Sequence, residues 1–256
     1  MSRRFFADEP IIGDTAQLTG AEAEHAVKVL RAKVGDLVTL FDGGGAEFPA
    51  RITAMGRSGV ALAVLARREV SRELATEVTL GVALPKGDRQ RWLVEKAVEL
   101  GVSSLVPLIT QRGVAQPNEA ALGRLRRYVI EAAKQSGRNR LLQIAAPQAF
   151  AGFGRQASRA AFRILAHPGL DSVPIAELAL PGPAGAVSCA VGPEGGFTDE
   201  ELAAADGWRR VSLGLRILRV ETAAVALAAW FSLRDAIRPG REPQTVAGTQ
   251  NVTSGE

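Results

Sequence analysis

The stretch AVSCAVGPEGGFTDEELAAADGWRRVSLGLRILRVETAAVALAA, residues 186–229, decides the fold. Its first six residues are apolar and suit a strand that is buried on both faces. The glycine loop, residues 192–196, then turns the chain, because proline fixes one φ and the pair Gly195-Gly196 permits positive φ and close approach of a ligand. Thr198 and Glu201 have the spacing of a capping box, so a helix begins there. A short strand, an irregular loop and a long helix over 221–237 are expected to follow.

The charges around this loop restrict the ligand that it can bind. Asp199, Glu200 and Glu201 suit the positive end of the helix but would repel a phosphate. Further on, residues 213–220 offer no Ser, Thr, Asp or Asn to cap the long helix, so its first N–H groups need partners. A heterocycle could supply the acceptors. These features favour a neutral or positively charged ligand.

GPEGGF (192–197) followed by LGLRILRVETA (213–223) resembles the cofactor-binding end of SPOUT-class RNA methyltransferases, in particular the RsmE family. That family methylates N3 of a uridine in 16S ribosomal RNA of the small ribosomal subunit. The resemblance implies an α/β domain with a parallel sheet, a deep trefoil knot and S-adenosyl-L-methionine (SAM) bound in it. The alternative is a plain α/β domain with a glycine-rich turn and a hydrophobic terminal helix.

The resemblance also implies which residues hold the cofactor. They lie on three segments that follow expected strands: Ala166, His167, Gly192, Pro193, Glu194, Gly195, Gly196, Leu213, Gly214, Ile217, Leu218, Thr222 and Ala223. Methylation of uridine N3 requires that its proton leaves and that the anion on O2 and O4 is stabilised. Arg138, Glu194 and Arg219 are the catalytic candidates. Their alternative roles are a phosphate contact, orientation of the loop and an ion pair with Glu221, respectively.

Composition narrows the remaining classes of function. The chain has 256 residues and one cysteine, Cys189, in an expected buried strand, which excludes an intramolecular disulfide. His25 and His167 fall in different expected domains, so no metal site is predicted. The P-loop and Rossmann fingerprints are absent. No apolar run reaches membrane-spanning length and no signal segment is recognisable, so we expect a cytoplasmic protein.

Positive charge is concentrated in one segment, although the net charge is only +4. Residues 112–142 hold seven basic residues and two acidic ones: Arg112, Arg124, Arg126, Arg127, Lys134, Arg138 and Arg140 against Glu119 and Glu131. Such a cluster is typical of a protein that binds a polyanion such as RNA. The alternative is a solvated helix face.

The pattern of elements predicts two domains. Residues 1–70 contain short strands, glycine turns and one helix, which favours a small β-barrel. Thr19 and Glu22 have the spacing of a capping box at the start of that helix. Here Arg4, Phe6, His25, Lys28 and Arg31 resemble the PUA-like RNA-binding domain of the same family. Strands alternate with helices over 77–238, which indicates a mainly parallel sheet. Asn118 is a candidate cap for the helix that reaches Gln135. The tail, residues 239–256, is predicted to be disordered.

Two further stretches resemble family motifs: KGDR (86–89) and EAAKQSGR (131–138). They add Lys86, Arg89, Arg138 and Arg140 to the residues expected to contact RNA. A proline that often follows the second motif is missing here, which makes the path of that loop uncertain. The leading hypothesis is a SAM-dependent 16S rRNA uridine-N3 methyltransferase, active as a homodimer with its site at the interface. The alternative is an inactive RNA-binding protein of ribosome assembly that kept the fold.

Overall fold

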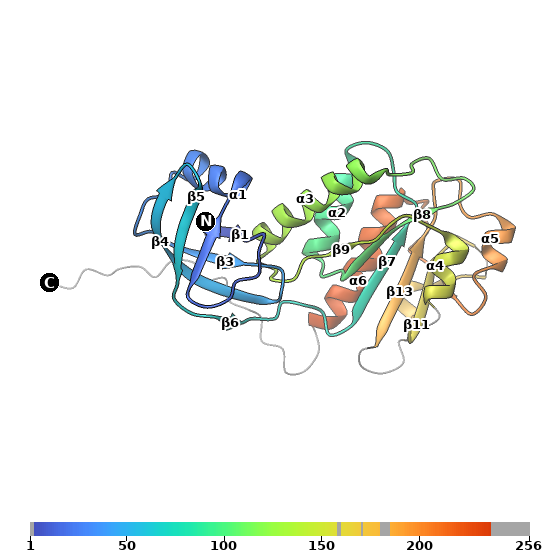
Figure 1. Ribbon diagram of the computed structural model, residues 1–256. Helices are drawn as coiled ribbons and strands as arrows, with labels where there is room; N and C mark the ends of the chain where they lie inside the picture. Colours follow the sequence, from blue (N-terminus) through green and yellow to red (C-terminus); the bar gives the residue numbers. More distant parts are fainter. Residues whose placement is uncertain (1–2, 158–159, 170, 180–184, 237–256) are drawn as a thin grey trace.

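The computed structural model describes residues 3–157, 160–169, 171–179 and 185–236. Two β-sheets lie at opposite ends of an elongated molecule, one built from residues before Val70 and one from residues after Thr76 (Figure 1). The predicted tail, residues 239–256, lies outside the described residues. Within the described ranges, no helix combines the length and the apolar character needed to cross a membrane.

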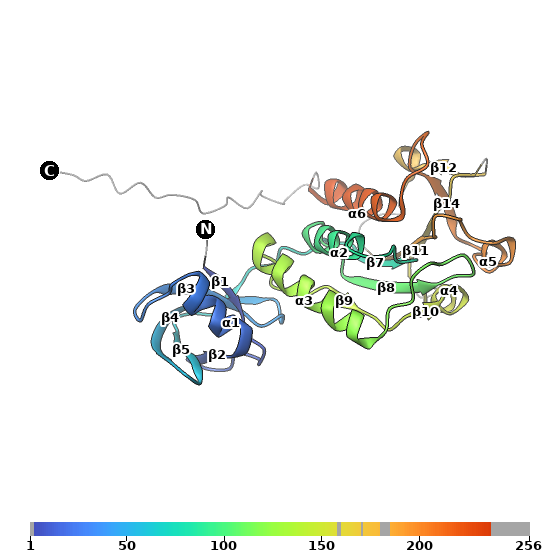
Figure 2. The ribbon, with the colours of Figure 1, turned by 90° about the horizontal axis from the view of Figure 1, so that it is seen from above.

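The N-terminal sheet is a curved half-barrel (Figure 2). It contains β1 (Arg4–Phe6), β2 (Thr15–Leu18), β3 (Leu37–Phe41), β4 (Ala46–Gly56), β5 (Gly59–Val64) and β6 (Arg68–Glu69). Their order is β1-β3-β4-β5-β2, and β6 pairs with β4. Alternate residues of β4 and β5 point inward, and Phe5, Leu40 and Leu62 are at most 2% exposed in the core that results. The sequence thus predicts the strand-rich unit correctly.

Helix α1 (Gly20–Glu24) begins at Thr19 as expected, and the π-helical turn η1 (His25–Val29) follows it. The expected capping box is wrong, however, because Thr19 makes no side-chain capping bond. Its intended partner, Glu22, accepts hydrogen bonds from the Phe6 N–H (3.1 Å) and from Lys134 Nζ (2.7 Å) instead. A contact with the second domain has therefore replaced the local one.

The C-terminal sheet is parallel throughout its described strand pairs. Its strands are β7 (Glu77–Val82), β8 (Ser104–Ile109), β9 (Gln143–Ile144), β10 (Gln148–Ala149), β11 (Phe162–Ala166), β12 (Val173–Pro174), β13 (Ala186–Val191) and β14 (Arg209–Ser212). The order is β10-β8-β7-β13-β11-β14-β12, and β9 pairs with β8. The quoted stretch therefore supplies β13, at the centre of the sheet, as its apolar sequence predicts.

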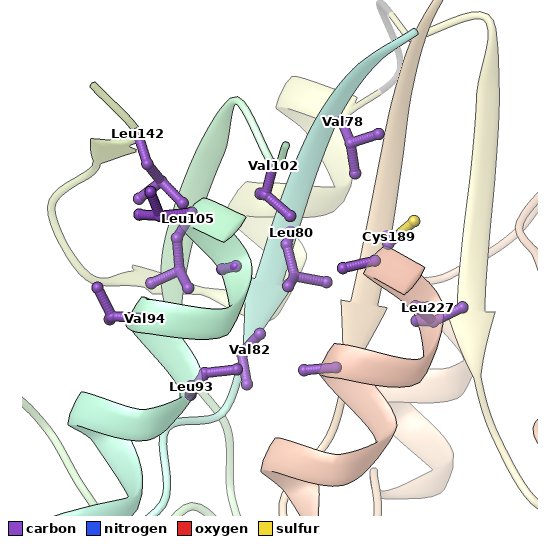
Figure 3. Close-up of a cluster of buried hydrophobic side chains, with 14 of the residues drawn as sticks. Val78, Leu80, Val82, Leu93, Val94, Val102, Leu105, Leu142, Cys189 and Leu227 are labelled. Atoms are coloured by element: carbon purple, nitrogen blue, oxygen red, sulfur yellow. The ribbon is translucent and has the colours of Figure 1, made fainter. Parts of the chain in front are cut away.

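Helices cover both faces of this sheet (Figures 1 and 2). They are α2 (Arg89–Glu99), α3 (Glu119–Ser136), α4 (Phe150–Ala157), α5 (Asp199–Ala203) and α6 (Val220–Ala236), with a 3₁₀ turn η2 (Ile175–Glu177). Leu80, Leu93 and Leu227 belong to the core under α2, α3 and α6, which Figure 3 shows in part. Phe153 and Trp208 belong to the core on the opposite face.

Cys189 lies in the first of these cores and is fully buried. Burial raises the pKa of its thiol far above the usual range. The cysteine is therefore a small core residue, as the sequence suggests.

Candidate functional site

A hollow of about 110 Å³ lies at the carboxyl ends of β11, β13 and β14, where parallel sheets generally bind ligands. Its walls come from the turn after β11, the glycine loop after β13, the loop after β14 and the start of α6. The lining residues are Ala166, His167, Pro168, Val191, Gly192, Pro193, Glu194, Gly196, Phe197, Val211, Leu213, Gly214, Arg216, Ile217, Leu218, Val220 and Ala223. Apolar side chains dominate this list, with Glu194 and Arg216 among the few charged ones.

Glycine is required at two positions of the loop after β13, for different reasons. A Cβ on Gly192 would lie 2.8 Å from the ring of Phe197, which is 5% exposed and packed in the core. Gly196 has φ 71°, in the left-handed region that side chains disfavour, and a Cβ there would meet no protein atom within 4 Å. Gly195 is outside that region, so only one of the two expected glycines uses positive φ.

The short helix α5 after this loop is capped as predicted. Thr198 Oγ1 accepts from the Glu201 N–H (3.3 Å), and the Glu201 carboxylate accepts from the Thr198 N–H (2.9 Å). Glu201 also accepts from the Gln111 N–H (2.9 Å), and Arg112 donates to the Gly195 carbonyl (2.7 Å). The segment after β8 therefore holds the outside of the glycine loop, and the donors of α5 serve the protein itself rather than an anion.

Arg89, the first residue of α2, lies beside the hollow between two carboxylates. Its Nη1 is 3.2 Å from Glu194 Oε1 and 3.6 Å from Glu221 Oε2. The side chain of Glu221 is 8% exposed, and its Oε2 accepts no hydrogen bond from any described residue. Sequence reasoning named Arg89 and Glu194 separately and missed Glu221, although a carboxylate at the start of a helix in the second resemblance segment was a usable signal.

The loop between β14 and α6 presents large apolar side chains to solvent. Leu215 is 101% exposed and Ile217 is 90% exposed. Gly214, at φ 122°, turns the chain into this loop. Arg216 lines the hollow, whereas Arg219 is exposed and does not. Of the two arginines in the loop, the structure thus favours Arg216 over the expected Arg219 as a neighbour of a ligand.

Eleven of the thirteen residues expected at the cofactor line this one hollow. Gly195 and Thr222 do not: Gly195 packs against Arg112, and Thr222 is exposed on the outer side of α6. Sequence reasoning missed Val191, Phe197, Val211, Val220, Pro168 and Arg216. The apolar residues among them lie at the ends of strands and helices, where a sequence pattern does not distinguish a core residue from one that lines a binding site.

Arg138 was expected to act in catalysis or to contact RNA, but it is 3% exposed and lies at the junction of the two domains. Its guanidinium donates to both carboxylate oxygens of Glu73 and to the carbonyls of Val98 (3.0 Å) and Val102 (2.9 Å). The helix α3 ends at Gly137, whose φ is 78°, and this turn sends the arginine inward. Burial and four donated hydrogen bonds place Arg138 in the domain junction, which corrects the expectation that it contacts RNA or the reacting base.

Arg4 and Phe6 are also buried, at 8% and 9% exposure, and this corrects their assignment to an RNA surface. Arg4 donates to Asn139 Oδ1 and to the Arg138 carbonyl (3.1 Å), and it pairs with Glu47 (3.3 Å). Burial lowers the pKa of the Arg4 guanidinium. Asn139 is itself 2% exposed, so the loop without the family proline is fixed within the junction.

The other residues expected at RNA form separate groups. His25, Lys28 and Arg31 follow one another along η1 and its end, where Lys28 and Arg31 are exposed. Lys86 is exposed just before α2, and Arg140 is exposed beside Gly44, with which it forms a β-bridge.

The chain matches two family profiles, one described as an RNA methyltransferase domain over residues 72–232 and one as an RNA methyltransferase PUA domain over residues 18–65. It is 38% identical over 231 residues to the ribosomal RNA small subunit methyltransferase E of Synechocystis sp.. That match covers 88% of this chain and 76% of the relative.

Two solved structures are similar over almost their whole length. One is a ribosomal RNA small subunit methyltransferase E from Neisseria gonorrhoeae bound to S-adenosyl methionine, with TM-score 0.81, 30% identity and coverage of 91% of this chain and 98% of that one. The other is a putative methyltransferase from Legionella pneumophila in complex with SAM, with TM-score 0.84, 29% identity and the same coverage.

Proposed function

The chain belongs to the family of ribosomal RNA small subunit methyltransferase E proteins, in which a PUA domain precedes a SPOUT-class methyltransferase domain, and we propose that it methylates N3 of one uridine in 16S ribosomal RNA with SAM as donor. The observation that carries the proposal is the hollow at the carboxyl edge of the sheet, walled by the glycine loop and residues 213–220. The trefoil knot implied by the resemblance is part of the proposal. A ribosomal RNA substrate would place the protein in the cytoplasm.

The residues around the hollow fit this cofactor. Ala166, Val211, Leu218 and similar apolar side chains suit the faces of an adenine ring, and the backbone at Gly196 and Gly214 leaves room for close approach. A sulfonium carries positive charge, which suits the Glu194 carboxylate at the rim of the hollow. When bound, SAM supplies an electrophilic methyl group.

The chain's own residues then position the acceptor and stabilise its charge. Glu194, at the rim of the hollow, is placed to accept the proton of uridine N3. Arg89 lies between Glu194 and Glu221, and its other N–H donors would stabilise the anion that spreads onto O2 and O4. Glu221 acts through Arg89 and is therefore a positioning residue. Arg89 replaces Arg138 in the role that sequence reasoning had offered to the latter.

We also propose that the active form is a homodimer. Ala224, Leu227 and Ala228 of α6 are buried in the protein's own core, but Val225, Ala226 and Ala229 remain partly exposed along its other side. Leu233 at 68% exposure and the loop tips Leu215 and Ile217 extend the same apolar character. A second copy would cover these side chains and bring its own residues to the rim of the hollow.

Primer extension on small-subunit RNA from a strain that lacks the gene tests the function. Adding back this protein is expected to restore a stop at one uridine, because a methyl group on N3 blocks base pairing. The Gly196→Val variant, folded but with a filled hollow, is expected to restore none. If folded wild-type protein binds the RNA but produces no stop, the inactive RNA-binding function replaces the enzymatic one.

A further inference from the structure

A second hollow, of about 440 Å³, lies outside the site described above. It is bounded by the start of α2, the segment before α3 and the first half of α3, which lie side by side in Figures 1 and 2. Gly87, Asp88 and Gln90 line it, and Arg89 between them holds Glu194 of the first hollow. Arg89 thus connects the lining of the second hollow, through its chain neighbours, with Glu194 of the first.

One wall of this second hollow is a cation–π pair, Arg91 and Tyr128. The guanidinium of Arg91 lies over the ring of Tyr128, 5.1 Å from its centroid, and its Nε donates to Glu95 (2.7 Å). Tyr128 is half-buried on α3, so the ring is fixed in place. Aromatic rings and arginine planes of this kind are the surfaces on which unpaired RNA bases stack.

The polar groups of the hollow differ in whether the protein already uses them. Gln90 donates to the Pro85 carbonyl (2.6 Å), and Asn118 accepts from the Ala121 N–H as the cap of α3. Arg124 is exposed, and no ion pair or hydrogen bond joins its guanidinium to a described residue. The lining holds one acidic residue, Asp88, and two basic ones, Arg91 and Arg124. Arg91 is paired with Glu95, so Arg124 supplies the charge that an anion could meet in this hollow.

Most basic residues of the segment 112–142 already have partners within the protein. Arg138 and Lys134 serve the domain junction, at 3% and 8% exposure. Arg126 pairs with Glu119 (2.6 Å), and Arg112 holds the glycine loop. Among the arginines on α3, Arg124 is the one that lines this hollow, whereas Arg127 is exposed but is not part of the lining. Arg140, after α3, lies beside Gly44 of the half-barrel. Of the positive charge concentrated in this segment, Arg124 is therefore the part that faces the second hollow.

We propose that the second hollow binds a nucleotide that flanks the target uridine in single-stranded RNA, with its base against Arg91 and Tyr128 and its phosphate on Arg124. The inference rests on the proposed function, which supplies the RNA. It adds a contact on the methyltransferase domain itself, separate from the N-terminal half-barrel. This contact would fix the register of the strand, so that one uridine and not its neighbour reaches Glu194 and Arg89.

The test compares Arg124→Ala with Arg126→Ala, two single-charge removals at exposed positions of the same helix. Binding of the protein, saturated with S-adenosylhomocysteine, to small ribosomal subunits from the strain lacking the gene is measured against salt. Arg124→Ala is expected to weaken binding several-fold and to lower the slope of log affinity against log salt by about 0.7. Arg126→Ala is expected to leave both within error. Tyr128→Leu, which keeps apolar packing, is expected to weaken binding by about tenfold without changing the slope.

A second measurement separates this inference from the function on which it rests. Affinity for S-adenosylhomocysteine is expected to be unchanged in all three variants, since none of them lines the first hollow. If Arg124→Ala and Arg126→Ala behave alike while the wild type methylates its RNA, the second hollow is a solvated helix face and the inference is overturned. If the wild type transfers no methyl group, the function fails, and the binding contrast between the two variants still decides the hollow.

Discussion

The hollow beside the glycine loop and the junction between the domains use similar residues in opposite ways. Both contain an arginine from a segment that resembles a family motif, Arg89 and Arg138, paired with glutamates. At the hollow, Glu194 is 42% exposed, Glu221 keeps one oxygen without a hydrogen bond, and Leu215 is fully exposed. At the junction, Arg138 and Lys134 are nearly buried and paired with Glu73 and Glu22.

This difference shows that membership of a motif does not assign a role to a charged residue. What separates the two regions is how far the protein itself satisfies the polar groups. A buried guanidinium that is paired and hydrogen-bonded within the protein stabilises the fold and is costly to disturb. A half-exposed one beside a hollow remains available to a ligand. Variants of the junction should therefore change stability first, and variants of the hollow should change binding first.

The largest effect on stability is expected for Arg138→Ala. It removes a buried cation that donates to both oxygens of the Glu73 carboxylate and to the Val98 and Val102 carbonyls. Removing one member of a buried pair costs about 3–5 kcal/mol, which urea denaturation would measure. Arg126→Ala, which breaks an exposed pair, is the matched control and should cost less than about 1 kcal/mol. An Arg138→Ala protein of normal stability but impaired RNA binding would reverse the assignment.

A somewhat smaller effect is expected for the pair that ties α3 to the half-barrel. Lys134→Met removes the cation paired with the Glu22 carboxylate, whose side chain is 11% exposed. The free energy of unfolding should fall by about 3 kcal/mol. Adding Glu22→Gln removes the unpaired charge but keeps an acceptor for the Phe6 N–H, so the double variant should regain part of that loss. Urea denaturation of both singles and the double measures the coupling. Strictly additive effects would show that the pair does not couple the domains.

The loop tips beside the hollow provide a smaller effect, on assembly rather than on folding. Leu215→Glu places a charge on a side chain that has no packing to lose within the protomer. If a second copy covers it, the dimer dissociation constant should rise at least tenfold, or about 1.4 kcal/mol, as measured by light scattering over a dilution series. Val34→Glu, at a position 61% exposed in the half-barrel, is the control and should have no effect. A wild type that is monomeric and active would refute the dimer.

The sequence predicted most of the fold because its signals are local. The apolar run that forms β13, the capping box at Thr198 and the Asn118 cap of α3 each depend on a few neighbouring residues, and each is found in the structure. The same rule failed at Thr19, where Lys134 and Phe6 compete for Glu22. A local sequence pattern cannot indicate such partners, because they lie far away in the sequence.

The site was predictable in part for a related reason. Gly192, Gly196 and Gly214 are recognisable in the sequence because glycines in such a pattern indicate turns, so the loops around the hollow were predicted. Val191, Val211 and Val220 also line it but look like any core residue. Arg138 shows the converse error, since a basic residue inside a basic segment reads as a surface contact until its burial is known.

Calorimetric titration with S-adenosylhomocysteine tests most directly whether the hollow binds the cofactor. Gly196→Val puts a side chain on a backbone at φ 71° and into the hollow, and it should reduce affinity at least tenfold, or about 1.4 kcal/mol. Gly195→Ala meets only the side chain of Arg112, at 3.3 Å, and should stay within about threefold of wild type. Tight binding by the wild type and Gly195→Ala with loss in Gly196→Val is the predicted result. Equal affinity in both variants, or none in a folded wild type, would contradict the account.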